Sequence, residues 1–102
     1  VDDMREVYER VKPHLERKYD VDYSNNEKDA LDKIRTNNYT MVITDYHLGE
    51  ESPKGGLNVV RTAKERGLVV MLISTENHEQ EALESGADFL FKREFFEVVK
   101  HD

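Results

Sequence analysis

Several residues with ionisable or hydroxyl side chains stand directly after short apolar segments of this sequence: Asp2, Asp3, Asp45, Ser74, Thr75 and Lys92. Asp45 follows residues 41–44, the hydroxyl pair follows residues 68–73, and Lys92 follows residues 89–91. If these apolar segments are parallel strands of one sheet, their carboxyl ends lie at the edge where open α/β proteins bind ligands. The side chains would then meet in space although they are far apart in the sequence.

Such a set of side chains has a definite chemistry. Crowded carboxylates repel one another, and some must take up a proton unless a cation lies among them. Mg²⁺ binds one or two carboxylates together with water and phosphate oxygens. With the cation present, Asp45 stays ionised and can attack phosphorus to form an aspartyl phosphate. The Lys92 ammonium and the Ser74 hydroxyl can then share the phosphoryl oxygens with the metal, so the set predicts a magnesium-dependent phosphate site.

The elements that must position these side chains can be predicted from the pattern of apolar residues. Residues 41–44, 68–73 and 89–91 are continuously apolar or β-branched, which is typical of strands buried on both faces, and residues 19–23 form a weaker candidate. Val1 is interpreted as the last residue of a strand that starts before this chain. Between the strands, apolar residues recur at helical spacing: Met4, Val7, Val11 and Leu15; Ala30, Leu31 and Ile34; Val59, Val60 and Ala63; Ala82 and Leu83. This alternation predicts a single domain, residues 1–102, with an α/β fold and a doubly wound parallel sheet that lacks most of its first strand.

Local signals refine the helix boundaries. Ser24 and Glu27 have the spacing of a capping box that opens the second helix. Pro13 is expected to kink or restart the first helix. Gly67 and Gly86 are expected to end the third and fourth helices.

Composition limits the possible functions. With 37% apolar and 36% charged residues, the 102-residue chain is typical of a soluble globular domain, which we expect to be cytoplasmic. It has neither a signal-peptide pattern nor an apolar run of the roughly 20 residues that span a membrane. Zero cysteines exclude disulfides, thiol catalysis and cysteine-ligated metals, and the four histidines lack ligand-like spacing. A net charge of −7 argues against direct nucleic-acid binding.

The ordered set of segments resembles the receiver domain of two-component response regulators along essentially the whole chain. The matching segments are "VDD" at residues 1–3, "VITDYHL" at 42–48, "LIST" at 72–75 and "SGADFLFK" at 85–92. The resemblance implies a flavodoxin-like sheet with helices on both faces. It also implies residue roles: Asp45 as phospho-acceptor, Asp3 as direct Mg²⁺ ligand, Asp2 acting through water, the His47 backbone carbonyl as a further ligand, Ser74 (alternatively Thr75) and Phe89 as switch residues, and Lys92 as phosphate-binding lysine.

The sequence departs from the family pattern at several points. Gly49 stands where the family usually has a proline, and the loop from there to Gly56 is longer than usual. Arg93 replaces the proline that normally follows the lysine through a cis bond, and a cis bond before arginine would cost about 2.5–4 kcal/mol. The segment between Ser74 and Lys92 is shorter than usual, and a last helix of about two turns is expected.

Each residue also has a purely structural interpretation. Asp3 with Glu6 fits a capping box for the first helix. Asp45 suits a turn, Ser74 or Thr75 suits the N-cap of the fourth helix, and Lys92 suits a solvated strand end. Phe89 suits the core, where Phe95 and Phe96 are expected to pack. Taken as a set at one sheet edge, the residues favour the phosphate site.

The function implied by the resemblance is that of a signalling module, not an enzyme acting on external substrates. A sensor histidine kinase or phosphotransfer protein would donate the phosphoryl group, and the switched domain would signal to an output domain or partner, with homodimerisation on phosphorylation a further possibility. His47 and Glu76 would tune the lifetime of the phosphorylated state. One alternative is a pseudo-receiver, a protein-interaction module that works without phosphorylation. The other is a small Mg²⁺-dependent phosphotransferase, which needs a second general acid where His47 stands.

Overall fold

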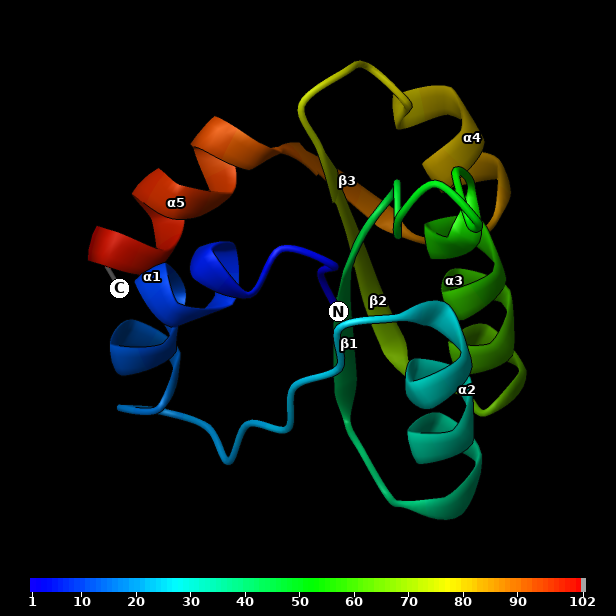
Figure 1. The fold of residues 1–102 in the computed structure, drawn as a ribbon, viewed down its shortest axis with the longest axis horizontal. Coiled ribbons are helices and arrows are strands. Elements are labelled where there is room, and N and C mark those ends of the chain that lie inside the picture. The colour runs from blue at the N-terminus through cyan, green and yellow to red at the C-terminus, as the bar shows by residue number, and fades with distance from the viewer. Residues whose placement is uncertain (102) are drawn as a thin grey trace.

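A three-stranded parallel sheet forms the centre of the computed structural model, which describes residues 1–101 (Figure 1). The strands lie in the order β1-β2-β3, with β1 spanning Met41–Asp45, β2 Val69–Ser74 and β3 Asp88–Phe91. The three stronger strand predictions are confirmed with small shifts, because Asp45 and Ser74 belong to the strands that they were expected to follow. The register pairs Asp45 with Ile73 and Ser74 with Phe91, so all three strands end at the same edge.

Helices cover both faces of the sheet, as predicted (Figure 1). The helices α3 and α4 connect successive parallel strands, and right-handed crossovers place them on the same face, together with α2. The opposite face is covered by the helix pair from the two ends of the chain, α1 and α5. The helix bounds are α1 Arg5–Leu15, α2 Glu27–Thr36, α3 Gly55–Glu65, α4 Glu79–Glu84 and α5 Lys92–His101. No helix among the described residues is both long and apolar enough to traverse a bilayer.

The core consists of two apolar clusters separated by the sheet. The larger cluster joins α2, α3 and α4 to the sheet, and Leu72, Val59 and Val60 are fully buried there. The smaller cluster joins α1 and α5 to the other face through Val11, Ile73, Phe95 and Val99, with Phe96 partly buried beside them. Neighbouring positions of β2 therefore serve opposite faces, as the two-residue period of a strand requires.

Two predicted helix starts are wrong. Asn26, not Ser24, caps α2, because its side chain accepts a hydrogen bond from the Asp29 N–H at 2.8 Å. The Ser24 hydroxyl instead donates to the Asp29 carboxylate at 2.7 Å. At α1 the expected capping box of Asp3 and Glu6 does not form, since the cap position is Met4 and has no side-chain cap bond. Met4 is 53% exposed and does not join the apolar face on which it was predicted to lie.

Further helix details also differ from expectation. Pro13 lies inside α1, which runs on to Leu15 without restarting. The short helix α4 buries only Ala82, and Leu83 is 58% exposed because so short a helix presents a single residue to the sheet. The helix α5 begins directly at Lys92 and is ten residues long, more than the two turns expected. The predicted ends are confirmed, since α3 and α4 stop before Gly67 and Gly86, which have φ of 74° and 91°.

The weak strand prediction for residues 19–23 is wrong, because no regular strand forms there. A strand needs a neighbour to pair with, and residues 19–23 pair with no strand of the sheet that the described residues form. The Val1 amino group donates to the Ile43 carbonyl at 2.6 Å, and the Asp45 N–H donates to the Val1 carbonyl at 2.8 Å. On the other side, the Asp2 N–H donates to the Ser24 carbonyl at 3.1 Å. The segment containing Val1 is therefore bonded on both sides, like the end of a middle strand.

A cavity of about 470 Å³ continues from Val1 along the free edge of β1. Its lining is mainly apolar and comes from both faces of the sheet, including Val11, Val21, Ile34, Ile43 and Phe95. Because hydrogen-bonding groups alternate along a parallel strand, the Ile43 N–H and the Met41 carbonyl face the same edge as the groups that bind Val1. The cavity thus has the walls and the backbone edge that a further parallel strand requires.

We expect four β-branched residues added before Val1 to occupy this cavity as a strand. Each buried Val or Ile side chain contributes about 1.5–3 kcal/mol, so the free energy of unfolding should rise by about 3 kcal/mol or more. The extension also replaces the buried amino group of Val1, whose pKa is lowered to about 6 by burial, with an amide. Urea unfolding followed by circular dichroism measures the change. A Gly-Ser extension of equal length is the control, and equal stability of the two proteins would contradict the prediction.

Candidate functional site

Lys92 joins the three segments that end at the carboxyl edge of the sheet. It is the first residue of α5, directly after β3, and its Nζ lies 2.9 Å from Asp45 Oδ2 and 3.2 Å from Asp2 Oδ2. The side chains are largely buried, with exposed fractions of 12% for Lys92, 10% for Asp45 and 7% for Asp2. The structure therefore brings together the lysine and two of the carboxylates that the sequence predicted to converge.

Hydrogen bonds to both the backbone and the side chain of Asp45 hold it at the end of β1. Its N–H donates to Val1, and its Oδ1 accepts the N–H of Tyr46 at 2.9 Å. Burial raises the pKa of Asp45, and the neighbouring charge of Asp2 adds to the rise, while Lys92 and the Tyr46 N–H oppose it. Burial alone would lower the pKa of Lys92, but its ion pairs with Asp45 and Asp2 outweigh burial and raise it. The lysine is therefore a permanent cation beside the carboxylate.

Asp2 is fixed by groups from the segment before α2. The Tyr23 hydroxyl donates to its backbone carbonyl, and Asp2 Oδ1 accepts the Met4 N–H at 2.9 Å. Its other carboxylate oxygen, Oδ2, is fully buried and accepts no hydrogen bond within the described residues, although Lys92 lies near it. A buried oxygen without a donor is costly unless a cation contacts it.

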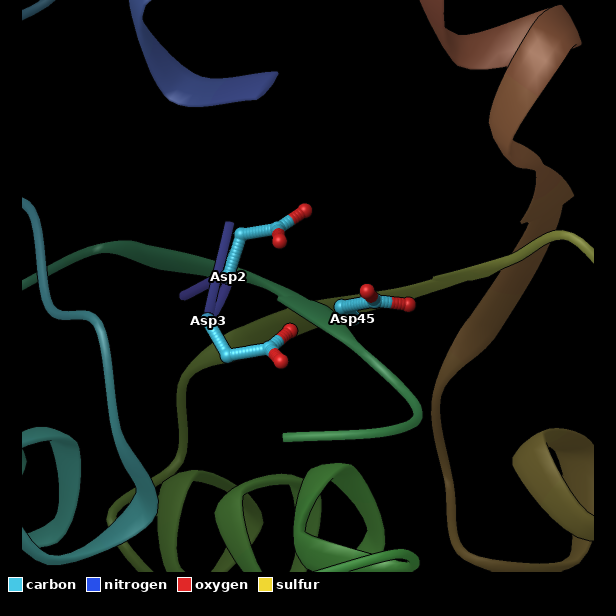
Figure 2. A group of neighbouring side chains, drawn as sticks. All are labelled: Asp2, Asp3 and Asp45. Carbon is cyan, nitrogen blue, oxygen red and sulfur yellow. The ribbon is translucent and has the colours of Figure 1, made fainter. Parts of the chain in front are cut away.

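The three aspartates fit a site for a hard cation. Asp2, Asp3 and Asp45 each offer one carboxylate oxygen, and these oxygens all lie within 4.8 Å of one another. Figure 2 shows Asp2 and Asp3 side by side on the N-terminal segment, with their carboxylates and that of Asp45 extending toward the same side. Oxygen ligands of this kind suit Mg²⁺ or Ca²⁺.

Ser74 and Thr75 have different environments. Ser74 is the last residue of β2 and is buried, whereas Thr75 lies outside the strand and is exposed. The Ser74 hydroxyl accepts the Glu76 N–H at 3.1 Å and thus bonds within its own loop. Neither residue caps α4, where the cap position is His78. Ser74 is therefore the hydroxyl at the same sheet edge as Asp45 and Lys92.

The aromatic residue predicted as a switch, Phe89, is partly buried against the larger core cluster. Its ring packs edge-to-face on Phe91, with 5.3 Å between the ring centroids. The guanidinium of Arg93 lies over the Phe91 ring, 4.6 Å from the ring centroid. Phe89 thus lies on β3, three residues before Lys92.

The departures from the family pattern leave the site intact. No cis peptide bond occurs in residues 1–101, so Arg93 follows Lys92 without that strain, and Lys92 still reaches both carboxylates. The long loop closes on itself, because the Leu48 N–H donates to the Ser52 carbonyl and the Ser52 N–H donates to the Gly49 carbonyl, each at 3.0 Å. The His47 side chain is exposed beside this loop, and its Nδ1 accepts the Gly49 N–H at 3.3 Å.

Gly56 brings α3 against the end of β1. Its N–H donates to the Tyr46 carbonyl at 2.9 Å. A Cβ at this position would collide with the Asp45 carbonyl oxygen and would lie 2.7 Å from Tyr46 Cα. Only glycine permits this approach of two backbones.

Tyr46 is the residue at the site that sequence reasoning missed. Its N–H donates to the Asp45 carboxylate, the residue is 6% exposed, and its hydroxyl donates to Glu81 Oε2 in α4 at 3.0 Å. Its position next to Asp45 was a signal of importance, but its partner lies 35 residues away in the sequence.

We predict that Lys92→Met destabilises the protein by about 3 kcal/mol at pH 7, because the substitution leaves two buried carboxylates without their cation. Loss of the ammonium raises the folded-state pKa of Asp45 further above its unfolded value. The variant is therefore close to the wild type in stability at low pH, where Asp45 is protonated, and loses stability as the pH rises and Asp45 must ionise. The difference in the free energy of unfolding between the wild type and the variant should be small near pH 4 and full at pH 7. Urea unfolding at both values measures it, and millimolar Mg²⁺ should restore part of the loss at pH 7. Lys100→Met, an exposed change on the same helix, is the control, and a deficit independent of pH would contradict this account.

Comparison with known proteins gives the fold. No family model matches the sequence, and no curated protein matches it. Among solved structures, a CheY-like response regulator receiver domain from Methanospirillum hungatei JF-1 is 20% identical with a TM-score of 0.78, covering 98% of this chain and 86% of that one. The receiver domain of the Francisella response regulator 1452 is 22% identical with a TM-score of 0.74, covering 98% and 89%.

A third solved structure is similar over nearly the whole of this chain. It is a response regulator protein from Burkholderia pseudomallei with a phosphorylated aspartic acid, calcium ion and citrate, and it is 21% identical with a TM-score of 0.81. The match covers 97% of this chain but 61% of that one. The chain therefore has the flavodoxin-like fold of response regulator receiver domains.

Proposed function

We propose that this chain is a phospho-accepting receiver module in which Asp45 takes a phosphoryl group from a phosphohistidine. The observation that carries the proposal is the position of Asp45, which ends β1 in contact with Lys92 and within 4.8 Å of the carboxylate oxygens of Asp2 and Asp3. A nucleophile, a fixed cation and two further oxygen ligands are the groups that phosphoryl transfer to a carboxylate needs.

The proposed transfer is a displacement at phosphorus. An Asp45 carboxylate oxygen attacks, the phosphorus–nitrogen bond of the phosphohistidine breaks, and its electron pair stays on the imidazole of the donor. Lys92, which binds Asp45 Oδ2 before transfer, then holds an oxygen of the phosphoryl group. Hydrolysis later breaks the acyl phosphate and returns Asp45 to its carboxylate form.

Mg²⁺ is the cofactor that we propose for this site. Asp3 and Asp45 would bind it directly, Asp2 would act through water, and the His47 backbone carbonyl would complete the protein ligands. When bound, the ion supplies positive charge that screens the carboxylates and the phosphoryl oxygens. The carboxylate oxygens of the three aspartates, all within 4.8 Å of one another, support this assignment.

Phosphorylation would act as a switch through residues at the strand ends. Ser74 would turn its hydroxyl from the Glu76 N–H to the phosphoryl group, and Phe89 would follow by moving inward. Such a change shifts an equilibrium between two conformations and alters the surface around α4 and β3. The exposed residues His47 and Glu76 would control the access of water to the phosphoryl group and so its lifetime.

The partners follow from this chemistry. A histidine kinase or phosphotransfer protein of the cytoplasm would supply the phosphohistidine, and an output domain, partner protein or second copy would bind the altered surface. The receiver would catalyse its own phosphorylation and dephosphorylation and would act on no external substrate.

We predict that the protein gains one phosphoryl group when it is incubated with acetyl phosphate and Mg²⁺. Intact mass spectrometry measures the gain, which should be absent without Mg²⁺ and absent in Asp45→Ala. Asp22→Asn, at an exposed site away from the cluster, is the matched control and should be phosphorylated like the wild type. A folded wild type that gains no phosphoryl group and forms no beryllofluoride complex would instead indicate a pseudo-receiver.

We further predict that Ser74→Ala weakens beryllofluoride binding by about tenfold, because a hydrogen bond to a charged group contributes about 1.5–3 kcal/mol. Thr75→Ala should bind like the wild type, since Thr75 is exposed and lies beyond the end of β2. Titration calorimetry in the presence of Mg²⁺ measures both affinities. A loss confined to Thr75→Ala would reverse the assignment of the switch hydroxyl.

A further inference from the structure

The helix α4 is weakly attached to the rest of the protein. It spans only Glu79–Glu84, it buries only Ala82, and its cap position, His78, makes no side-chain cap bond. In residues 1–101, the hydrogen bond from the Tyr46 hydroxyl to Glu81 is the one that links a side chain of α4 to the loop after β1. The position of α4 therefore depends strongly on this contact.

Three residues form one compact group at this contact, which we call the Tyr46 cluster: Tyr46, His78 and Glu81. The Tyr46 ring stacks on the His78 ring with 3.5 Å between centroids and 2° between the planes. The Tyr46 hydroxyl binds Glu81 Oε2 at 3.0 Å, and His78 Nδ1 lies 3.1 Å from Glu81 Oε1. Both oxygens of one carboxylate are thus engaged, each by a different member of the cluster.

The charges around the cluster favour an ionised Glu81. The hydrogen bond to His78, followed by that to Tyr46, lowers the pKa of Glu81, and the ammonium of Lys54 from the long loop acts in the same direction. Burial and the hydrogen bond to Glu81 raise the pKa of the Tyr46 hydroxyl, with the charges of Glu81 and Glu76 adding to the rise. Tyr46 thus remains a hydrogen-bond donor to a carboxylate.

The cluster is attached to the phosphoryl-acceptor site at two points. Tyr46 follows Asp45 directly and donates its N–H to the Asp45 carboxylate. His78 ends the short segment that starts at Ser74, whose hydroxyl accepts the Glu76 N–H. If Ser74 turns toward a phosphoryl group on Asp45, the Glu76 N–H loses its acceptor, and any shift of the segment up to His78 that follows would act on the stacked rings.

We propose that the Tyr46 cluster is a clasp that holds α4 and the preceding segment in the unphosphorylated position and thereby opposes the switch. This inference rests on the proposed function, because it concerns the response to a phosphoryl group on Asp45. Coupling of this kind is reciprocal, so a partner that displaces α4 and opens the clasp must favour phosphorylation by the same factor.

The test is beryllofluoride binding in the presence of Mg²⁺ to Tyr46→Phe, Glu81→Gln and the double variant. Tyr46→Phe keeps the buried ring and removes only the hydroxyl. Because a hydrogen bond of this kind contributes about 1 kcal/mol, each variant should bind about three- to tenfold more tightly than the wild type. The double variant should gain no more than the better single variant, since both changes act on the same contact: Tyr46→Phe removes the donor, and Glu81→Gln replaces the charged acceptor by a neutral one. Glu84→Gln is the matched control, because Glu84 lies on the same helix and, within residues 1–101, its side chain binds only Gln80.

A second measurement needs no phosphoryl analogue. Amide hydrogen exchange of α4 in the free protein should be faster in Tyr46→Phe and Glu81→Gln and unchanged in Glu84→Gln. Equal or weaker beryllofluoride binding by the first two variants, or unchanged exchange of α4, would overturn the clasp. A wild type that binds no beryllofluoride would contradict the proposed function and the coupling together, whereas binding that is equal in all variants would contradict the clasp alone.

Discussion

The ammonium of Lys92 is the charge that allows two carboxylates to be buried at one end of the sheet. It contacts Asp45 at 2.9 Å and Asp2 at 3.2 Å, and these residues come from β1 and from the N-terminal segment. Burying a carboxylate without a counter-charge is costly, so the acidic site depends on the strand that delivers the lysine. The helix α5 begins directly after β3, and its first residue is Lys92. The electrostatics of the site thus depend on the direct passage from β3 into α5.

The sheet provides the geometry within which this charge arrangement is possible. All three strands are parallel, so the ends that carry Asp45, Ser74 and Lys92 necessarily meet on one side. The crossover helices occupy one face and the terminal helices the other, so the loops that follow β1 and β2 lie at this edge (Figure 1). Chemical groups from distant parts of the sequence are brought together by topology alone.

This topology explains why much of the site could be predicted from the sequence. The apolar runs before Asp45 and Lys92 are unambiguous, and their ends predict convergence without knowledge of any contact. The helix starts were harder, because Ser24 and Asn26 are both good capping residues and only the three-dimensional position of Asp29 decides between them.

Other features of the structure depend on neighbours that the sequence does not reveal. The segment at residues 19–23 has strand-like residues but lacks a paired neighbour. The link from Tyr46 to Glu81 spans two elements whose mutual distance depends on the whole sheet. Finally, the contact at Gly56 allows changes in the length of the loop before it but not replacement of the glycine. Because α3 meets β1 backbone to backbone, the start of α3 is fixed beside the acceptor residue, and residues inserted between Tyr46 and Gly56 must bulge outward. Loop length can therefore drift during evolution without altering the site, while the glycine itself cannot be exchanged.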